Sequence, residues 1–202
     1  MLDHLAVTAE NLASGVSYVE NALGVQMAPG GQHDYMGTHN QLLGLGIFYL
    51  EVITINPEAP KPSHPRWFDL DNISGPPKLT NWIVQTDTLD ETLAKSPAGT
   101  GTPVKLTRGD LHWQMAVPDD GKLPFDGAFP ALIQWEGADH PALRLPDLKC
   151  RLKQLHVTHP QADGLRDALS VLDFGDVVSV HQGPAKNLQA EIETLHGIRI
   201  LE

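Results

Sequence analysis

The chain is short of cysteine, positive charge and long apolar runs, and each shortage excludes a class of protein. Cys150 is the only cysteine among 202 residues, which excludes an intramolecular disulfide and a thiolate metal cluster. Its 14 Lys and Arg residues against 25 Asp and Glu residues give a formal net charge of −11. Because no basic cluster could neutralise phosphates, we expect neither nucleic acid nor a membrane surface as a partner.

The lack of long apolar runs bears on location. No stretch approaches the length of a membrane span, and no basic region followed by an apolar core opens the chain. We therefore expect a cytoplasmic protein. The hydrophobic content of 41% is ordinary for a folded chain, and the length is enough to bury a sizeable core.

One unit of secondary structure opens the chain. Residues 2–7 alternate as a strand, and helical spacing then runs from a capping Asn11 to Gly24. Three strand-like runs complete a β-α-β-β-β order, at 25–27, 38–45 and 47–55.

This unit is repeated further along the chain. The stretch Leu79–Val84 repeats the opening pattern and begins the same order of elements, and a third start lies at Leu152–Val157. His4, Asn81 and Gln154 occupy matching places, with spacings of 77 and 73 residues. An internal repeat of this kind predicts an α+β fold built from similar modules.

The repeat also divides the chain. Between the first two units lies a stretch with six prolines and no period, which predicts an irregular connection anchored by Trp67 and Phe68. We expect four segments: a first module at 1–56, the proline-rich connection at 57–78, a second module at 79–145, and a third module packed on the same domain at 146–202.

Two polar groups stand out on the apolar strands of the first module. Glu51 lies within Ile47–Ile53, and His4 lies within the opening strand. A buried carboxylate is costly unless it is paired, protonated or bound to a cation, and a carboxylate beside an imidazole is a common start for a divalent metal site. The alternative is an edge-strand Glu and a core His bonded to a carbonyl.

Several short motifs, in a fixed order, resemble a known family. They are LDHLAV, ALGV, PGGQH, GTHNQLLGLG, FYLEVI, FPALIQW and HPA, and they extend roughly from Leu2 to Pro160. The chain resembles the glyoxalase-like domain family of the vicinal oxygen chelate superfamily. The resemblance implies tandem βαβββ modules that form a cupped mixed sheet. We expect the third, C-terminal module to have βαββ(β) order.

The resemblance also implies where a metal would bind, on the first and fourth strands of each module. In the first module these positions are His4 and Glu51. In the second they are Asn81 and Gln134, where many members have His and Glu, and amide oxygens bring no negative charge to a cation. We expect a divalent metal on His4, Glu51 and Gln134, with Asn81 as a substrate contact.

Other side chains are candidates for the same cup. His39 follows Thr38 and could face Glu51 as a ligand, a general base or a substrate contact; the alternative is a bond from its ring to the preceding loop. Arg66 could grip a substrate carboxylate or remain a surface group, and Trp113 could line the cup or the core. We take His39 and Glu51 as catalytic candidates, and Arg66 and Trp113 as substrate-binding candidates.

The resemblance implies a metal-assisted lyase, isomerase or dioxygenase-type enzyme acting on a small oxygenated molecule, whose vicinal oxygens the metal polarises. A metal-free protein that binds a small molecule in the same cup is the alternative, and a structural role without a ligand is a third. Open sheet edges favour a homodimer.

Overall fold

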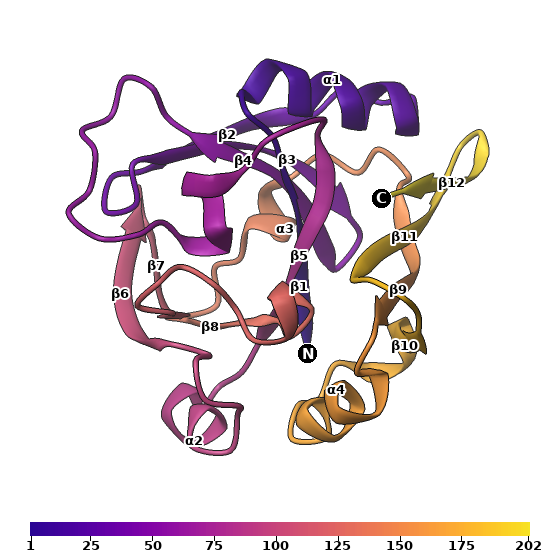
Figure 1. Cartoon of the computed structure of the whole chain (residues 1–202). Helices are drawn as coiled ribbons and strands as arrows, with labels where there is room; N and C mark the ends of the chain where they lie inside the picture. Colours follow the sequence, from indigo (N-terminus) through magenta and orange to yellow (C-terminus); the bar gives the residue numbers. More distant parts are fainter.

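The computed structural model describes residues 1–202 and contains both predicted βαβββ modules (Figure 1). The first consists of β1 (Leu2–Thr8), α1 (Leu12–Leu23), β2 (Ala28–His33), β3 (Thr38–Leu45) and β4 (Phe48–Ile55). The second consists of β5 (Lys78–Gln85), α2 (Leu89–Leu93), β6 (Thr102–Arg108), β7 (Leu111–Val117) and β8 (Ala131–Trp135). The helix α1 begins at its predicted cap, where the Asn11 side chain accepts from the Ser14 N–H, and it ends at a left-handed Gly24.

The two modules share one curled sheet of eight strands. Its order is β2-β3-β4-β1-β5-β8-β7-β6, so the modules meet where β1 and β5 pair antiparallel. In each module the first strand pairs in parallel with the fourth, β1 with β4 and β5 with β8. The predicted α+β class and cupped mixed sheet are confirmed.

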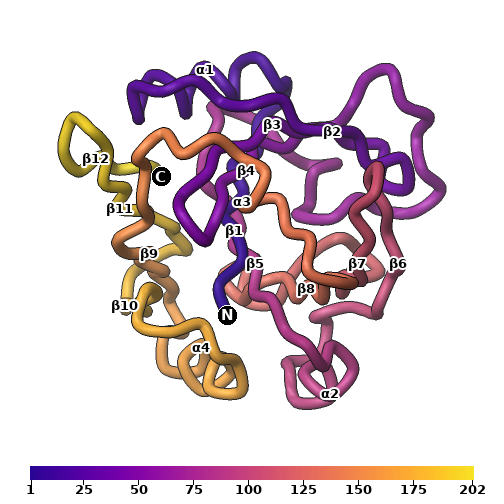
Figure 2. Tube along the Cα trace, turned by 180° about the vertical axis from the view of Figure 1, so that it is seen from behind, coloured from indigo at the N-terminus to yellow at the C-terminus, as the bar shows by residue number.

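The third unit forms a sheet of its own. It consists of β9 (Arg151–His159), α4 (Ala162–Leu169), β10 (Val178–Gln182), β11 (Asn187–Thr194) and β12 (Gly197–Leu201). The predicted order of elements along the chain is present, but the strand order β10-β9-β11-β12 differs from that of the two modules, because β9 pairs with the second and third strands of its unit. Figure 2 shows this sheet beside the cup.

Apolar side chains form two cores, one on each face of the curled sheet. On the convex face, residues of β1, β4 and β5 pack with α1, β9 and β11, around a fully buried Trp82. On the concave face, Ile53, Ile83 and Met115 pack with the aromatic residues of the connection. Strand residues alternate between these two cores, as the two-residue period requires.

The proline-rich connection closes the cup. Its short helix η1 (Trp67–Asn72) buries the predicted anchors Trp67 and Phe68 inside the concave core. Phe68 and Asp69 both have left-handed backbone, with φ of 57° and 53°, which turns the connection sharply over the cup. No helix of the structure is long and apolar enough to cross a membrane.

Candidate functional site

A row of three ionisable side chains crosses the concave face. The parallel pairing of β1 with β4 places Ala6 opposite Glu51 and brings the neighbouring His4 beside the carboxylate. The His4 Nε2 lies 3.5 Å from Glu51 Oε1, and its Nδ1 lies 2.5 Å from Asp3 Oδ1. All three residues are buried. The imidazole is therefore held between two carboxylates.

The charges of this row depend on one another. Burial alone would lower the pKa of His4, but the hydrogen bonds to Asp3 and Glu51 outweigh burial and raise it to about 9. Burial would raise the pKa of both carboxyl groups, but their contacts with His4, together with the His140 bond to Asp3, lower the pKa of Asp3 and of Glu51. At neutral pH the row consists of a carboxylate, an imidazolium and a second carboxylate.

Three polar groups from other parts of the chain hold the two carboxylates. The Asn40 Nδ2 donates to Glu51 Oε2 at 2.8 Å, and the Trp135 Nε1 donates to Asp3 Oδ2 at 2.8 Å. The His140 Nε2 lies 3.1 Å from the same Asp3 oxygen and is its donor, because the His140 Nδ1 accepts from a backbone N–H. These bonds fix the orientation of both carboxylates.

The glycine pair of the PGGQH motif positions Asn40. The Gly31 N–H donates to Asn40 Oδ1 at 2.9 Å, which turns the amide NH₂ toward Glu51. A Cβ on Gly30 would lie 2.2 Å from the Asn40 carbonyl oxygen, so only glycine permits this approach. Two of the motifs quoted from the sequence thus meet at the site.

The row opens into a pocket with mainly aromatic and apolar walls. Seven of the eleven residues that line the pocket are hydrophobic. Tyr49 stacks on the His4 ring at 4.3 Å between ring centroids. The remaining walls come from η1 and from the second module: Trp67, Phe68, Trp113, Met115, Ile133 and Trp135.

A guanidinium group also lines this pocket, next to Asn40 and His33. Arg108, at the end of β6, has only long contacts to neutral groups, 3.3 Å to His33 Nε2 and 3.4 Å to Asn40 Oδ1. Burial, together with the positive charge of Arg108, lowers the pKa of His33 to about 4, so the His33 ring is neutral. The Arg108 charge therefore has no carboxylate partner at ion-pair distance.

Comparison with known proteins identifies the family. A model of the glyoxalase-like domain matches residues 2–172. The chain belongs to the glyoxalase-like domain family of the vicinal oxygen chelate superfamily. No curated protein matches it.

Solved structures are similar to this glyoxalase-like protein in fold. A hypothetical protein from Staphylococcus aureus has 13% identity and a TM-score of 0.63 over 92% of this chain and 87% of that chain. The methylmalonyl-CoA epimerase of Mycobacterium tuberculosis has 15% identity and a TM-score of 0.44 over 68% and 88%. A xylose isomerase-like TIM barrel/4-hydroxyphenylpyruvate dioxygenase fusion protein has 17% identity and a TM-score of 0.45 over 97% and 30%.

Only part of the predicted residue set comes together. His4, Glu51 and Trp113 line one pocket. His39 lies on the other face of β3, because its neighbour Asn40 points into the cup. Arg66 is buried away from the pocket, where its guanidinium donates to Asp71 and to the Met36 carbonyl.

The two second-module positions also lie apart from Glu51. Gln134 is on the convex side of β8, where its Oε1 accepts from the Leu89 N–H at the start of α2. Asn81 faces the concave side but lines a different pocket. In the first module, Ala6 lies two residues after His4 and is opposite Glu51. In the second module, Ile83 lies two residues after Asn81 and is opposite Ala131. Ala131 therefore occupies the position that matches Glu51.

The four positions implied for a metal therefore do not converge. His4 and Glu51 face one point, but no group of three or more His, Cys, Asp or Glu side chains is placed to hold a cation. Arg108 adds a positive charge to the same pocket. The residues present do not fit a complete divalent-metal shell, which normally takes at least three protein ligands.

Besides Trp135, sequence reasoning missed four residues of the site: Asp3, Asn40, Arg108 and His140. Three of them lie within motifs quoted for the resemblance, at positions adjacent to or near the residues chosen. Arg108 lies outside all of these motifs, and only the curl of the sheet brings β6 close to β2.

Proposed function

We propose that this glyoxalase-like protein is a metal-independent isomerase or lyase that moves a proton on a small carbonyl compound. The observation that carries the proposal is the buried Glu51 carboxylate beside the His4 imidazolium, 3.5 Å away, at an aromatic-walled pocket. A base and an acid that share one apolar pocket suit the removal of a proton next to a carbonyl group.

Each group has a defined part in the reaction. Glu51 takes the proton from the carbon next to the carbonyl, and the electron pair of that C–H bond moves toward the carbonyl oxygen. The Nε2–H of His4 donates to this oxygen as it gains negative charge. Return of the proton to the same or an adjacent carbon gives an isomerase, and loss of a leaving group gives a lyase.

The surrounding residues support these roles of Glu51 as base and His4 as acid. Asp3 keeps His4 protonated, and the Asn40 amide holds Glu51 Oε2, so we assign the role of base to Glu51 Oε1, the oxygen beside His4 Nε2. Arg108 lacks a carboxylate partner, so we assign to it the carboxylate of a 2-oxo or 3-oxo acid. Trp113 and Trp135 enclose the apolar part of such a substrate.

Proton exchange in D₂O, followed by NMR across a panel of 2-oxo and 3-oxo acids, tests the proposal. We expect the wild type to exchange the proton next to the carbonyl in the presence of a chelator. We expect Glu51→Gln to slow the exchange by at least about 100-fold, the usual range for a lost general base. Glu58→Gln, an exposed carboxylate outside the pocket, is the matched control.

Other outcomes select the alternatives. Exchange that requires an added divalent ion would favour the metal-assisted enzyme. The contact between His4 and Asp3 supports this alternative, since a metal-binding His commonly donates its other nitrogen to a carboxylate. Quenching of tryptophan fluorescence without exchange would favour a binding protein. Exchange unchanged in Glu51→Gln would contradict the proposal.

A further inference from the structure

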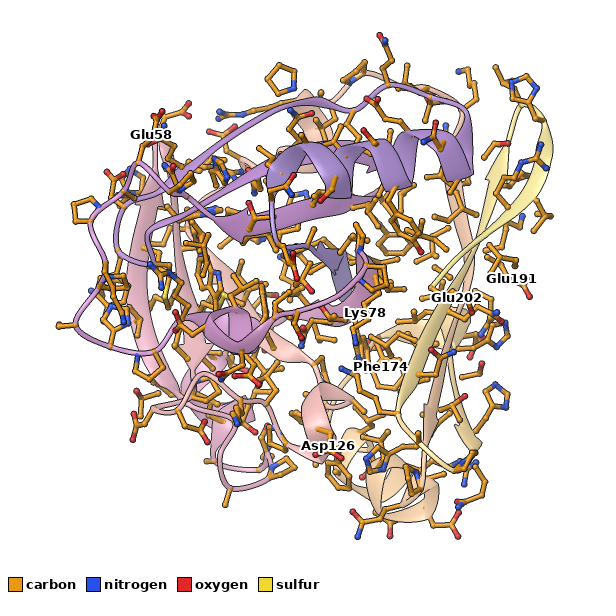
Figure 3. The ribbon with its side chains drawn as sticks, turned by 45° about the horizontal axis from the view of Figure 1, so that its top comes forward. Glu58, Lys78, Asp126, Phe174, Glu191 and Glu202 are labelled. Carbon is orange, nitrogen blue, oxygen red and sulfur yellow. The ribbon has the colours of Figure 1, made fainter.

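A second pocket lies between the cup and the third unit, apart from the Glu51 row. It encloses about 1060 Å³ of empty space, open mouth included, and four segments of the chain line it: η1, β5, the region of η2 (Phe125–Gly127), and the turn between β10 and β11. Figure 3 shows Lys78 and Asp126 in this region. Phe68 lines this pocket and the first one, so it separates the two.

Three ammonium groups gather at this pocket in a chain of net charge −11. Lys122 lies 3.9 Å from an Asp69 carboxylate, and both side chains are well exposed. Lys78 and Lys186 have no carboxylate at ion-pair distance. The negative charge of Asp126 acts on Lys186, but the Asp126 side chain is largely exposed and its Oδ2 is 3.7 Å from His159 Nε2.

Lys186 is the most constrained of the three. Its ammonium group reaches from the third unit to β5 and donates to the Thr80 carbonyl at 2.6 Å. Burial, and then the positive charge of Lys78, lowers the pKa of Lys186 to about 8. A negative group placed beside these two lysines would offset both effects, because an opposite charge favours the charged form of Lys186.

An amide donor points to the same place. Asn81 is only 4% exposed, and its side chain makes no hydrogen bond within the protein. A Cβ on Gly127 would lie 3.1 Å from Lys186 Nζ and 3.3 Å from Asn81 Nδ2, so the two donors converge at the pocket wall. The Asn81 amide reaches the solvent of the second pocket, where a ligand oxygen would replace water as its hydrogen-bond partner.

We propose that this second pocket binds the oxyanion of a small ligand, a carboxylate or a phosphate, through Lys186, Lys78 and Asn81. The site is independent of proton transfer at Glu51, and its ligand is held by charge and by the Asn81 amide. Lysine supplies the compact point charge that such a group needs.

Calorimetric titration of the full chain with inorganic phosphate and, separately, with malonate tests the proposal and distinguishes the two oxyanions. We expect Lys186→Met to weaken binding of the preferred probe by about tenfold or more, which is the loss of one charge-assisted contact. Asn81→Leu is expected to weaken it less. Lys186→Arg, which keeps the charge, should retain binding.

The controls keep the result specific. Lys105→Met removes an exposed charge on β6, outside both pockets, so we expect it to bind like the wild type. Circular dichroism shows whether each variant is folded, and Lys186→Arg with Asn81→Leu still tests the site if Lys186→Met unfolds. The proposal is overturned if neither phosphate nor malonate binds, or if Asn81→Leu binds the preferred probe as tightly as the wild type does.

Discussion

The two halves of the cup have the same topology and different chemistry. In the first module, His4 and Glu51 place charged groups on β1 and β4. At the matching positions of β5 and β8, the second module has Asn81 and Ala131. The second module instead supplies aromatic walls and Arg108. Repetition of a fold therefore need not repeat a site, because one half can hold the reacting groups while the other encloses the ligand.

The comparison can be tested most severely by removing the matched residues. His4→Ala leaves Asp3 and Glu51 buried without the cation between them, so we expect it to lower the free energy of unfolding by roughly 3–5 kcal/mol. Asn81→Ala removes a side chain without hydrogen bonds and is expected to cost about 1 kcal/mol or less. Urea unfolding at pH 7 measures both, and equal costs would contradict the asymmetry.

The pH dependence of stability sharpens the same contrast. The pKa of His4 is raised to about 9 in the folded chain, so its contribution is complete below about pH 6.5 and is lost as pH rises through 9. We expect the wild type to lose roughly 2–4 kcal/mol over this range relative to His4→Gln. If the free energies of unfolding of the two proteins change in parallel with pH, the pKa of His4 is not raised in the folded chain.

On the acid side the signs are reversed. The lowered pKa of Asp3 and of Glu51, and of His33 at about 4, means that the unfolded chain binds more protons than the folded chain below pH 6.5. Stability therefore falls as pH drops, and we expect the maximum near pH 6.5, where both losses are smallest.

The smallest effect is expected on the convex face of the second module. Gln134 caps α2 through the Leu89 N–H, so Gln134→Ala should cost about 1 kcal/mol, as for other lost caps, with proton exchange unchanged. Thermal unfolding and the D₂O assay measure the two quantities. Loss of proton exchange in this variant would show that Gln134 takes part in the reaction.

Sequence reasoning reached the fold because the repeat depends on the order of strands and helices. It also brought His4 and Glu51 together, since both lie on neighbouring strands. It failed where a shift of one residue along a strand decides which face of the sheet a side chain occupies. His39 and Gln134 point away from the pocket, because their neighbours Asn40 and Trp135 point into it.

Local irregularity concealed another member of the site. The pairing of β1 with β5 shifts between Leu2 and His4, so Asp3 and His4 reach the same network although they are consecutive. Strict alternation predicts opposite faces for such neighbours. Arg66 was a different case: its partner Asp71 is five residues away, and nothing in the sequence favours that ion pair over a substrate.

The segment that contains His140 has a consequence for the kinetics of the protein. After β8 the chain forms α3 (Pro141–Arg144) near β4 and β1 (Figure 2). Just before α3, His140 donates to Asp3 and contacts the Tyr49 ring. Each local opening of this segment leaves Asp3 with one donor fewer and admits water to a buried charge. The Ala142 N–H donates to His140 Nδ1 and loses this bond in each opening. We therefore expect the hydrogen-exchange rate of the Ala142 amide to report how often water reaches the row.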